Sequence, residues 1–159
     1  NKAQGQPVKI WGVLADGVLS VSVLPVGCNM SRATYAKLIK TRFPEWLGNC
    51  KYLVQDFERC LRCPVALEAL KSIGVELVKE YPRVSQDFSA IENAWKFLKE
   101  RLNSTLPQGV ETRDEFISRM RSGVSWVNRN RQRELRYLCT NQRERCKECE
   151  LLGGARTHW

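Results

Sequence analysis

Two acidic residues in the middle of this chain are placed as carboxylate ligands of a divalent metal would be. Asp56 ends an apolar run that begins at Tyr52 and is predicted to be a short buried strand. Glu92 lies just inside the predicted start of a helix, within residues 85–95. Many nucleases hold two divalent ions between carboxylates on such neighbouring elements. The pair therefore favours phosphodiester chemistry; the alternatives are an ordinary aspartate in a turn and a glutamate that caps its helix.

Local patterns predict the elements that position these residues. Two hydrophobic runs flank Asp16-Gly17, a favoured tight-turn pair, and therefore predict a hairpin. Ser31 is the expected cap of the first helix, and Gly74 ends the second. The predicted order is hairpin 8–26, helix 31–47, strand 52–56, helix 65–73, strand 75–78 and then helices, which is an α/β layer fold.

The helices that follow have their own start signals. Ser89 with Glu92 matches the capping-box pattern S-x-x-E, and Thr112 with Glu115 repeats it. A further helix is predicted to run through Cys149. The expected buried faces are Ile91, Trp95, Leu98 and Leu102 in one helix and Phe116, Met120, Val124 and Val127 in the next.

The charge balance favours a polyanionic partner. The 159 residues include 26 basic and 17 acidic side chains, a formal net charge of +9, and the sequence pI is about 9.4. Residues 96–159 hold 14 basic and 8 acidic residues, so most of the excess lies there. Nucleic acid is the first candidate partner. The predicted phosphate-contacting residues are Arg129, Arg131, Arg133 and Arg136, with a solvated helix face paired to Glu134 and Glu144 as the alternative.

The seven cysteines suggest reduced thiols in an intracellular compartment, because their number is odd and the chain is not small. Two C-x-x-C pairs, Cys60 with Cys63 and Cys146 with Cys149, have the form of half-sites of a Cys₄ zinc centre. Some eighty residues separate them and both are expected in helices, which argues against zinc. No apolar run is long enough to span a membrane.

Three strings together resemble the catalytic core of the mariner superfamily of DDE transposases. They are Val54-Gln55-Asp56, the segment from Ser85 to Trp95 (SQDFSAIENAW), and the following Lys96-Phe97-Leu98-Lys99. The hairpin with Trp11-Gly12 is similar to the second and third strands of that family. The resemblance covers residues 8–105, which gives a predicted division into a partial ribonuclease-H-like core, 1–105, and a helical basic C-terminal extension of the same domain, 106–159.

The resemblance implies a ribonuclease-H-like fold, a mixed sheet flanked by helices, with metal-dependent DNA cleavage and strand transfer. Asp56 and Glu92 would be catalytic ligands of Mg²⁺ or Mn²⁺ in a two-ion site, and Asp87 and Asn93 would support it. Hard divalent ions prefer such oxygen ligands. DNA would be the partner, a homodimer or larger assembly the form, and the nucleus the location.

The family uses three acidic residues, and the first lies on a strand before the hairpin. The chain begins after that point, and Asp16 is no substitute because it lies in the hairpin turn. We therefore expect an upstream segment or another chain to supply this central strand, since its neighbours would otherwise have unpaired edges. The alternative function is a transposase-derived, non-catalytic subunit that binds nucleic acid within a larger assembly.

Overall fold

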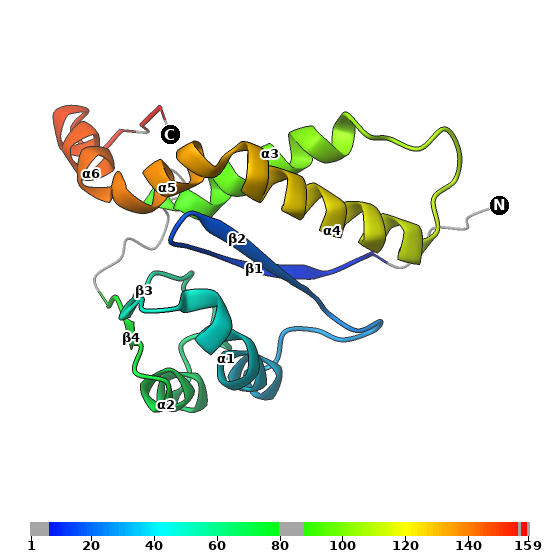
Figure 1. The fold of residues 1–159 in the computed structure, drawn as a ribbon. Helices are drawn as coiled ribbons and strands as arrows, with labels where there is room; N and C mark the ends of the chain where they lie inside the picture. Colours follow the sequence, from blue (N-terminus) through cyan, green and yellow to red (C-terminus); the bar gives the residue numbers. More distant parts are fainter. Residues whose placement is uncertain (1–6, 80–87, 156, 159) are drawn as a thin grey trace. The chain divides into compact units, whose positions relative to one another are not determined.

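The computed structural model describes residues 7–79, 88–155, 157 and 158, which belong to two compact units (Figure 1). The first unit contains Asn1–Cys28 and Asp87–Trp159, and the second is the intervening segment Asn29–Gln86. Both units combine helices with paired strands, so the chain is mixed α/β. The predicted division at residue 105 falls within the first unit; it followed the extent of the family resemblance and stays a prediction.

The first unit is built on the predicted hairpin. Strand β1 (Ile10–Ala15) pairs antiparallel with β2 (Val18–Val23), and Ala15 lies opposite Val18. Asp16 and Gly17 between them have φ of 47° and 74°. Two successive positive φ values are those of a type I′ turn, whose twist matches that of the flanking strands. The hairpin prediction is confirmed.

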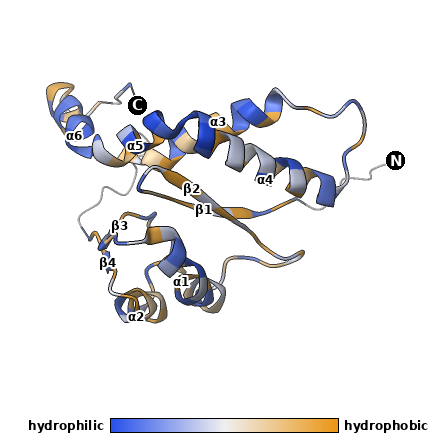
Figure 2. Ribbon diagram, viewed as in Figure 1, coloured by the Kyte–Doolittle hydropathy of each residue, from blue (hydrophilic) through white to orange (hydrophobic). Residues whose placement is uncertain are grey.

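Helices cover the hairpin in this unit. They are α3 (Ala90–Asn103), α4 (Arg113–Asn130) and α5 (Gln132–Thr140), with α6 (Gln142–Leu151) packed on α5. In Figure 1, α3 and α4 lie side by side along the hairpin. Figure 2 shows that the hairpin is predominantly hydrophobic, whereas α4 alternates in hydropathy along its length. The buried core between them consists of Leu19, Ala94, Leu98, Val127, Leu135 and Leu138.

The predicted helix faces agree with this core. Leu98, Met120 and Val127 are fully buried. Ile91, Trp95, Leu102 and Val124 pack against the core from partly buried positions, and Phe116 is half-buried.

Two contacts fix how helices sit on the hairpin. A Cβ added to Gly12 of β1 would lie 2.6 and 2.7 Å from ring carbons of Trp95, so α3 approaches this strand too closely for any side chain there. The Asn128 side chain of α4 bonds Leu19 of β2 twice: it accepts from the backbone N–H at 2.9 Å and donates to the carbonyl at 3.0 Å. Asn128 thus satisfies backbone groups on the outer edge of β2.

Helix starts and ends differ in part from prediction. The capping box of Thr112 and Glu115 is formed. The one predicted at Ser89 is not: the Glu92 N–H bonds the backbone carbonyl of Ser89 at 3.0 Å, and the Ser89 side chain makes no cap bond. The single helix predicted through Cys149 is two, α5 and α6. They separate at Asn141, which is buried and accepts a hydrogen bond from Arg145.

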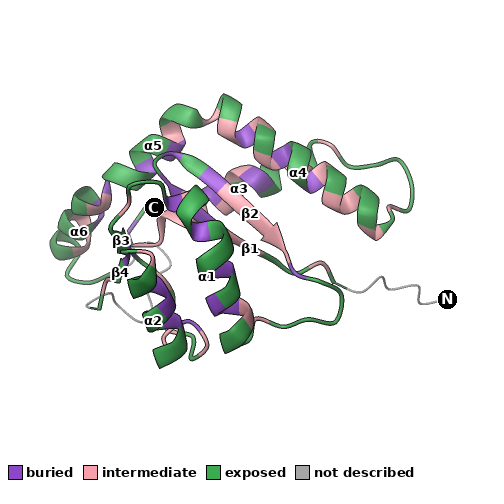
Figure 3. Cartoon of the chain, turned by 60° about the horizontal axis from the view of Figure 1, so that its bottom comes forward, coloured by how far each residue is buried: buried purple, intermediate pink, exposed green. Residues whose placement is uncertain are grey.

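The second unit packs two helices with a short parallel strand pair. Helix α1 (Arg32–Leu47) begins at its predicted cap, Ser31, which accepts a hydrogen bond from the Thr34 N–H at 3.1 Å. Helix α2 (Pro64–Ser72) packs against α1. Figure 3 shows buried residues interrupting the exposed surface of both helices. On α1 the fully buried side chains are Tyr35, Ile39 and Phe43, spaced by four residues.

The strand predicted to end at Asp56 is shorter than expected. Strand β3 (Tyr52–Leu53) pairs parallel with β4 (Glu76–Leu77) over two residue pairs. The chain then leaves the ladder because Gln55 bonds to the segment before α2. Its side-chain amide donates to the Leu61 carbonyl, and its backbone carbonyl accepts from Arg62. Among the described residues each sheet has two strands, so the predicted additional strand, like the ribonuclease-H-like fold, stays a prediction.

Candidate metal and nucleic-acid sites

Asp56 lies in the second unit, in the loop between β3 and α2, and its side chain is exposed. No described residue forms a hydrogen bond or ion pair with its carboxylate. Arg62 instead donates to backbone carbonyls, from Nε to Asp56 at 3.3 Å and from Nη2 to Gln55 at 3.0 Å. The Arg62 guanidinium also lies 3.5 Å from the centre of the Phe57 ring. Arg62 therefore fixes the backbone at Asp56, while the carboxylate oxygens of Asp56 are exposed to solvent.

Gln55 anchors the loop that carries Asp56. Its amide oxygen accepts a hydrogen bond from the Tyr35 hydroxyl of α1, and its amide nitrogen donates to the Leu61 carbonyl at 2.8 Å. Burial raises the pKa of the Tyr35 phenol well above its ordinary value, so Tyr35 keeps its proton and donates at neutral pH. The glutamine of the Val54-Gln55-Asp56 string thus has a structural role beside the exposed aspartate.

Glu92 and Asn93 repeat this arrangement in the first unit. Glu92 is exposed in the first turn of α3, and no described residue bonds its carboxylate. Asn93, the next residue, accepts a hydrogen bond through Oδ1 from Nη2 of Arg145 at 3.1 Å. Arg145 is fully buried, and its Nε donates to Oδ1 of Asn141 at 3.0 Å. This contact, which sequence patterns did not suggest, ties the start of α3 to α6.

The predicted metal ligands come from both units, Asp56 from the second and Glu92 from the first. Asp87 lies outside the described residues. Exposed carboxylates are the correct donor type for Mg²⁺ or Mn²⁺. Within residues 7–79, 88–155, 157 and 158, however, no three His, Cys, Asp or Glu side chains are grouped so that they could hold a metal ion.

The four arginines predicted to contact phosphate have different surroundings. Arg131 forms an ion pair with Glu134 at 2.9 Å, and this hydrogen bond lowers the pKa of Glu134. The Arg136 side chain packs beside Gly17 of the hairpin turn. Arg133 and Arg129 are exposed, and Arg129 lies at the end of α4. Arg131 and Arg136 therefore already contact other residues of the first unit.

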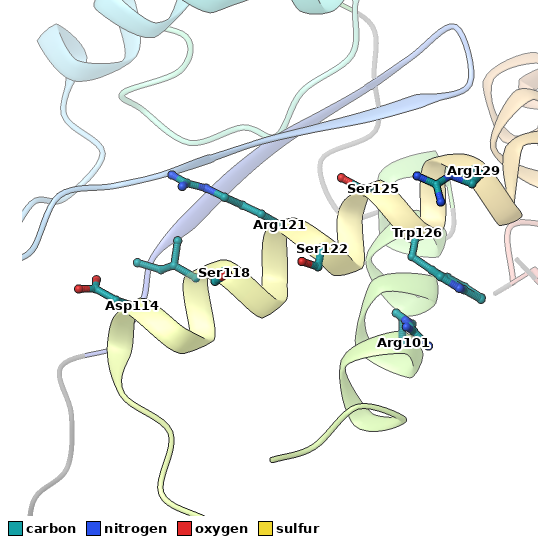
Figure 4. A pocket seen from close by; sticks show the side chains of 9 residues that line it. Arg101, Asp114, Ser118, Arg121, Ser122, Ser125, Trp126 and Arg129 are labelled. Atoms are coloured by element: carbon teal, nitrogen blue, oxygen red, sulfur yellow. The ribbon is translucent and has the colours of Figure 1, made fainter.

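A basic groove on α3 and α4 was missed by sequence reasoning (Figure 4). It is a surface depression of about 720 Å³, and we call it the α4 groove. The row of polar residues along α4, opposite its buried face, could have predicted part of the groove from the sequence. Arg101 comes from α3, and only the packing of α3 on α4 places it there. The lining residues are Arg101, Asp114, Ile117, Ser118, Arg121, Ser122, Ser125, Trp126 and Arg129.

All seven cysteines are free thiols. Cys60 lies in a turn and Cys63 precedes the first residue of α2, so the expectation that this pair is helical was wrong; Pro64 begins the helix after them. Cys146 and Cys149 lie in α6, in the other unit. Across the described parts of the chain, no helix is both long enough and apolar enough to cross a bilayer.

In comparisons with known proteins, neither a family model nor a curated protein matches this chain.

Proposed function

We propose that this chain derives from the catalytic core of a mariner-type DDE transposase and acts on DNA, with Asp56 and Glu92 as two of its metal-binding carboxylates. One observation carries the proposal. In each of the two motif strings, an exposed carboxylate that forms no hydrogen bond or ion pair with the described residues is adjacent to an amide that is anchored by hydrogen bonds. Gln55 precedes Asp56, and Asn93 follows Glu92.

The packing of the hairpin supports the same ancestry. Trp11-Gly12 and the Ile91–Trp95 string are separate in sequence, yet Gly12 lies under the Trp95 ring with no room for a Cβ. The two motifs are therefore in direct contact within the first unit. It concerns the scaffold of the proposed site and not its chemistry.

Carboxylate oxygens at Asp56 and Glu92 would hold Mg²⁺ or Mn²⁺, ions that activate a water or 3′-hydroxyl and stabilise the leaving oxygen of a phosphodiester. The chain's own contribution is orientation. Tyr35 and Gln55 hold the loop of Asp56, and Arg145 holds the first turn of α3 through Asn93. Because the family uses three carboxylates, cleavage and strand transfer would need a further acidic residue beside Asp56 and Glu92.

The second candidate is a transposase-derived subunit that binds DNA without cleaving it. Arg101, Arg121 and Arg129 favour it, because no described residue forms an ion pair with them. Such arginines would contact phosphates whether or not the metal site is complete.

A nicking assay on supercoiled plasmid with Mn²⁺ separates the two candidates. We expect any nicking by the wild-type chain to be lost in Asp56→Ala and in Glu92→Gln. Glu45→Gln on α1 and Glu100→Gln on α3 are matched controls, since both residues are exposed acids on helix surfaces. Equal nicking by wild type and Asp56→Ala would refute the catalytic assignment. DNA binding without nicking would favour the second candidate.

A further inference from the structure

The α4 groove combines three cations with hydroxyl groups on one exposed surface (Figure 4). Ser118 and Ser122 lie along the side of α4 that faces the viewer. Arg121 extends to one side of this row, and Arg101 lies on the other. Hydroxyls and guanidinium groups are the usual side-chain partners of phosphate oxygens.

The groove's arginines are available, in contrast to their neighbours. Arg119, two residues before Arg121 on α4, forms a two-point ion pair with Glu111 at 2.7 Å. In the part of the chain that the structure describes, Arg101, Arg121 and Arg129 have no ion pair. Asp114 is the single acidic residue in the lining, so the groove has a net charge of +2. An anion would therefore meet little competition from internal carboxylates.

One arginine is oriented by an aromatic ring. The Arg101 guanidinium lies 4.8 Å from the centre of the Trp126 ring, within cation–π range. This contact holds the cation of α3 beside α4 without neutralising its charge. The guanidinium edge keeps its N–H donors for a bidentate contact with phosphate.

The groove is long enough for several phosphates. Arg121 and Arg129 are eight residues apart on α4, which corresponds to about 12 Å along the axis at about 1.5 Å per residue. At about 3.4 Å per nucleotide in each strand, this length spans three to four nucleotides. A single small anion would occupy only part of it.

We propose that the α4 groove binds the phosphodiester backbone of DNA. Arg101, Arg121 and Arg129 contact successive phosphates, and Ser118, Ser122 and Ser125 donate hydroxyl hydrogen bonds between them. The site shares its ligand class with the proposed function but contains neither Asp56 nor Glu92. Binding there needs no divalent metal.

Fluorescence anisotropy with a labelled 20-base-pair duplex in EDTA tests the site independently of catalysis. The test variant is Arg101→Gln/Arg121→Gln/Arg129→Gln, and the charge-matched control is Lys37→Gln/Lys40→Gln/Arg42→Gln on α1. We expect the groove variant to weaken binding about tenfold or more at low salt and to reduce the slope of log K against log salt by about 2 to 3, because each lost phosphate contact removes about 0.9. The control should change affinity less than about threefold, because non-contacting charges act only through the screened field.

Ser122→Glu is a second test that does not depend on the folding of the triple variant. It adds one negative charge inside the groove while every arginine remains, and it should also weaken binding. Inorganic phosphate at constant ionic strength should not displace the duplex. Equal losses in groove and control variants, displacement by phosphate, or no binding by the wild-type chain would each overturn the proposal. Binding of the duplex by the wild-type chain in EDTA, with no nicking in Mn²⁺, would instead count against the proposed metal chemistry alone.

Discussion

At the residue scale, each candidate carboxylate depends on a neighbour that does no chemistry. Gln55 and Asn93 use their amides to fix the backbone, and Asp56 and Glu92 remain exposed. Buried polar groups are costly to leave unpaired, so Tyr35 and Arg145 make these anchors specific. Replacing an amide would therefore disturb the adjacent carboxylate indirectly.

Gly12 provides the sharpest test at this scale. Gly12→Ala places a methyl group 2.6 Å from the Trp95 ring, and we expect the free energy of unfolding to fall by about 1–3 kcal/mol through overpacking. Urea denaturation followed by circular dichroism measures it. Gly109→Ala is the control, because a Cβ there meets nothing within 4 Å.

The same contact can be examined with a double variant. Combining Gly12→Ala with Trp95→Leu should cost less than the sum of the two single changes, because the clashing ring is absent. Additive costs would show that the methyl group is accommodated without contacting Trp95.

At the element scale, the edge of the hairpin is stabilised by a side chain rather than by a strand. Asn128 of α4 donates to and accepts from the backbone of Leu19, as a neighbouring strand would. The contact also sets the rotation of α4, because Val127, the preceding residue, is fully buried in the core. That rotation leaves the α4 groove on the opposite, exposed surface.

Asn128→Ala leaves both backbone groups of Leu19 without this partner. We expect a loss of about 1–3 kcal/mol in the free energy of unfolding, because part-buried donors and acceptors lose their hydrogen bonds. Asn128→Asp keeps an acceptor for the N–H but loses the donor to the carbonyl, so it should also destabilise. Asn130→Ala, on the exposed side of the same helix, should change stability far less in the same denaturation assay; equal effects at 128 and 130 would contradict the edge role.

At the scale of the whole molecule, the two proposed metal ligands come from two compact units. A metal ion bound at either carboxylate would stabilise the folded chain by mass action, since the unfolded chain holds no such site.

Thermal unfolding with Mn²⁺ tests this binding. We expect Mn²⁺ to raise Tm in the wild-type chain, by the equivalent of about 2.7 kcal/mol when the free ion is one hundred times Kd. Asp56→Asn and Glu92→Gln should each reduce the shift, whereas Glu45→Gln and Glu100→Gln should retain it. A shift that survives both Asp56→Asn and Glu92→Gln would contradict their assignment as metal ligands.

Local chemistry made several elements predictable. The Asp16-Gly17 turn, the Ser31 cap and the capping box of Thr112 with Glu115 involve residues within a few positions of each other, so their sequence is sufficient. The buried faces of α3 and α4 follow from helical periodicity in the same way. Ser89 had the same pattern but not the bond, because a backbone carbonyl took the N–H of Glu92 instead.

The sequence by itself therefore determined the hairpin, most of the helices and the motif strings that contain Asp56 and Glu92. Only the tertiary structure decided what surrounds them. Gln55 meets Tyr35 and Asn93 meets Arg145 across 20 and 52 residues, distances at which no local pattern specifies a partner. The α4 groove arises for the same reason: packing of α3 on α4 places Arg101 against Trp126, and periodicity within either helix alone cannot predict that meeting.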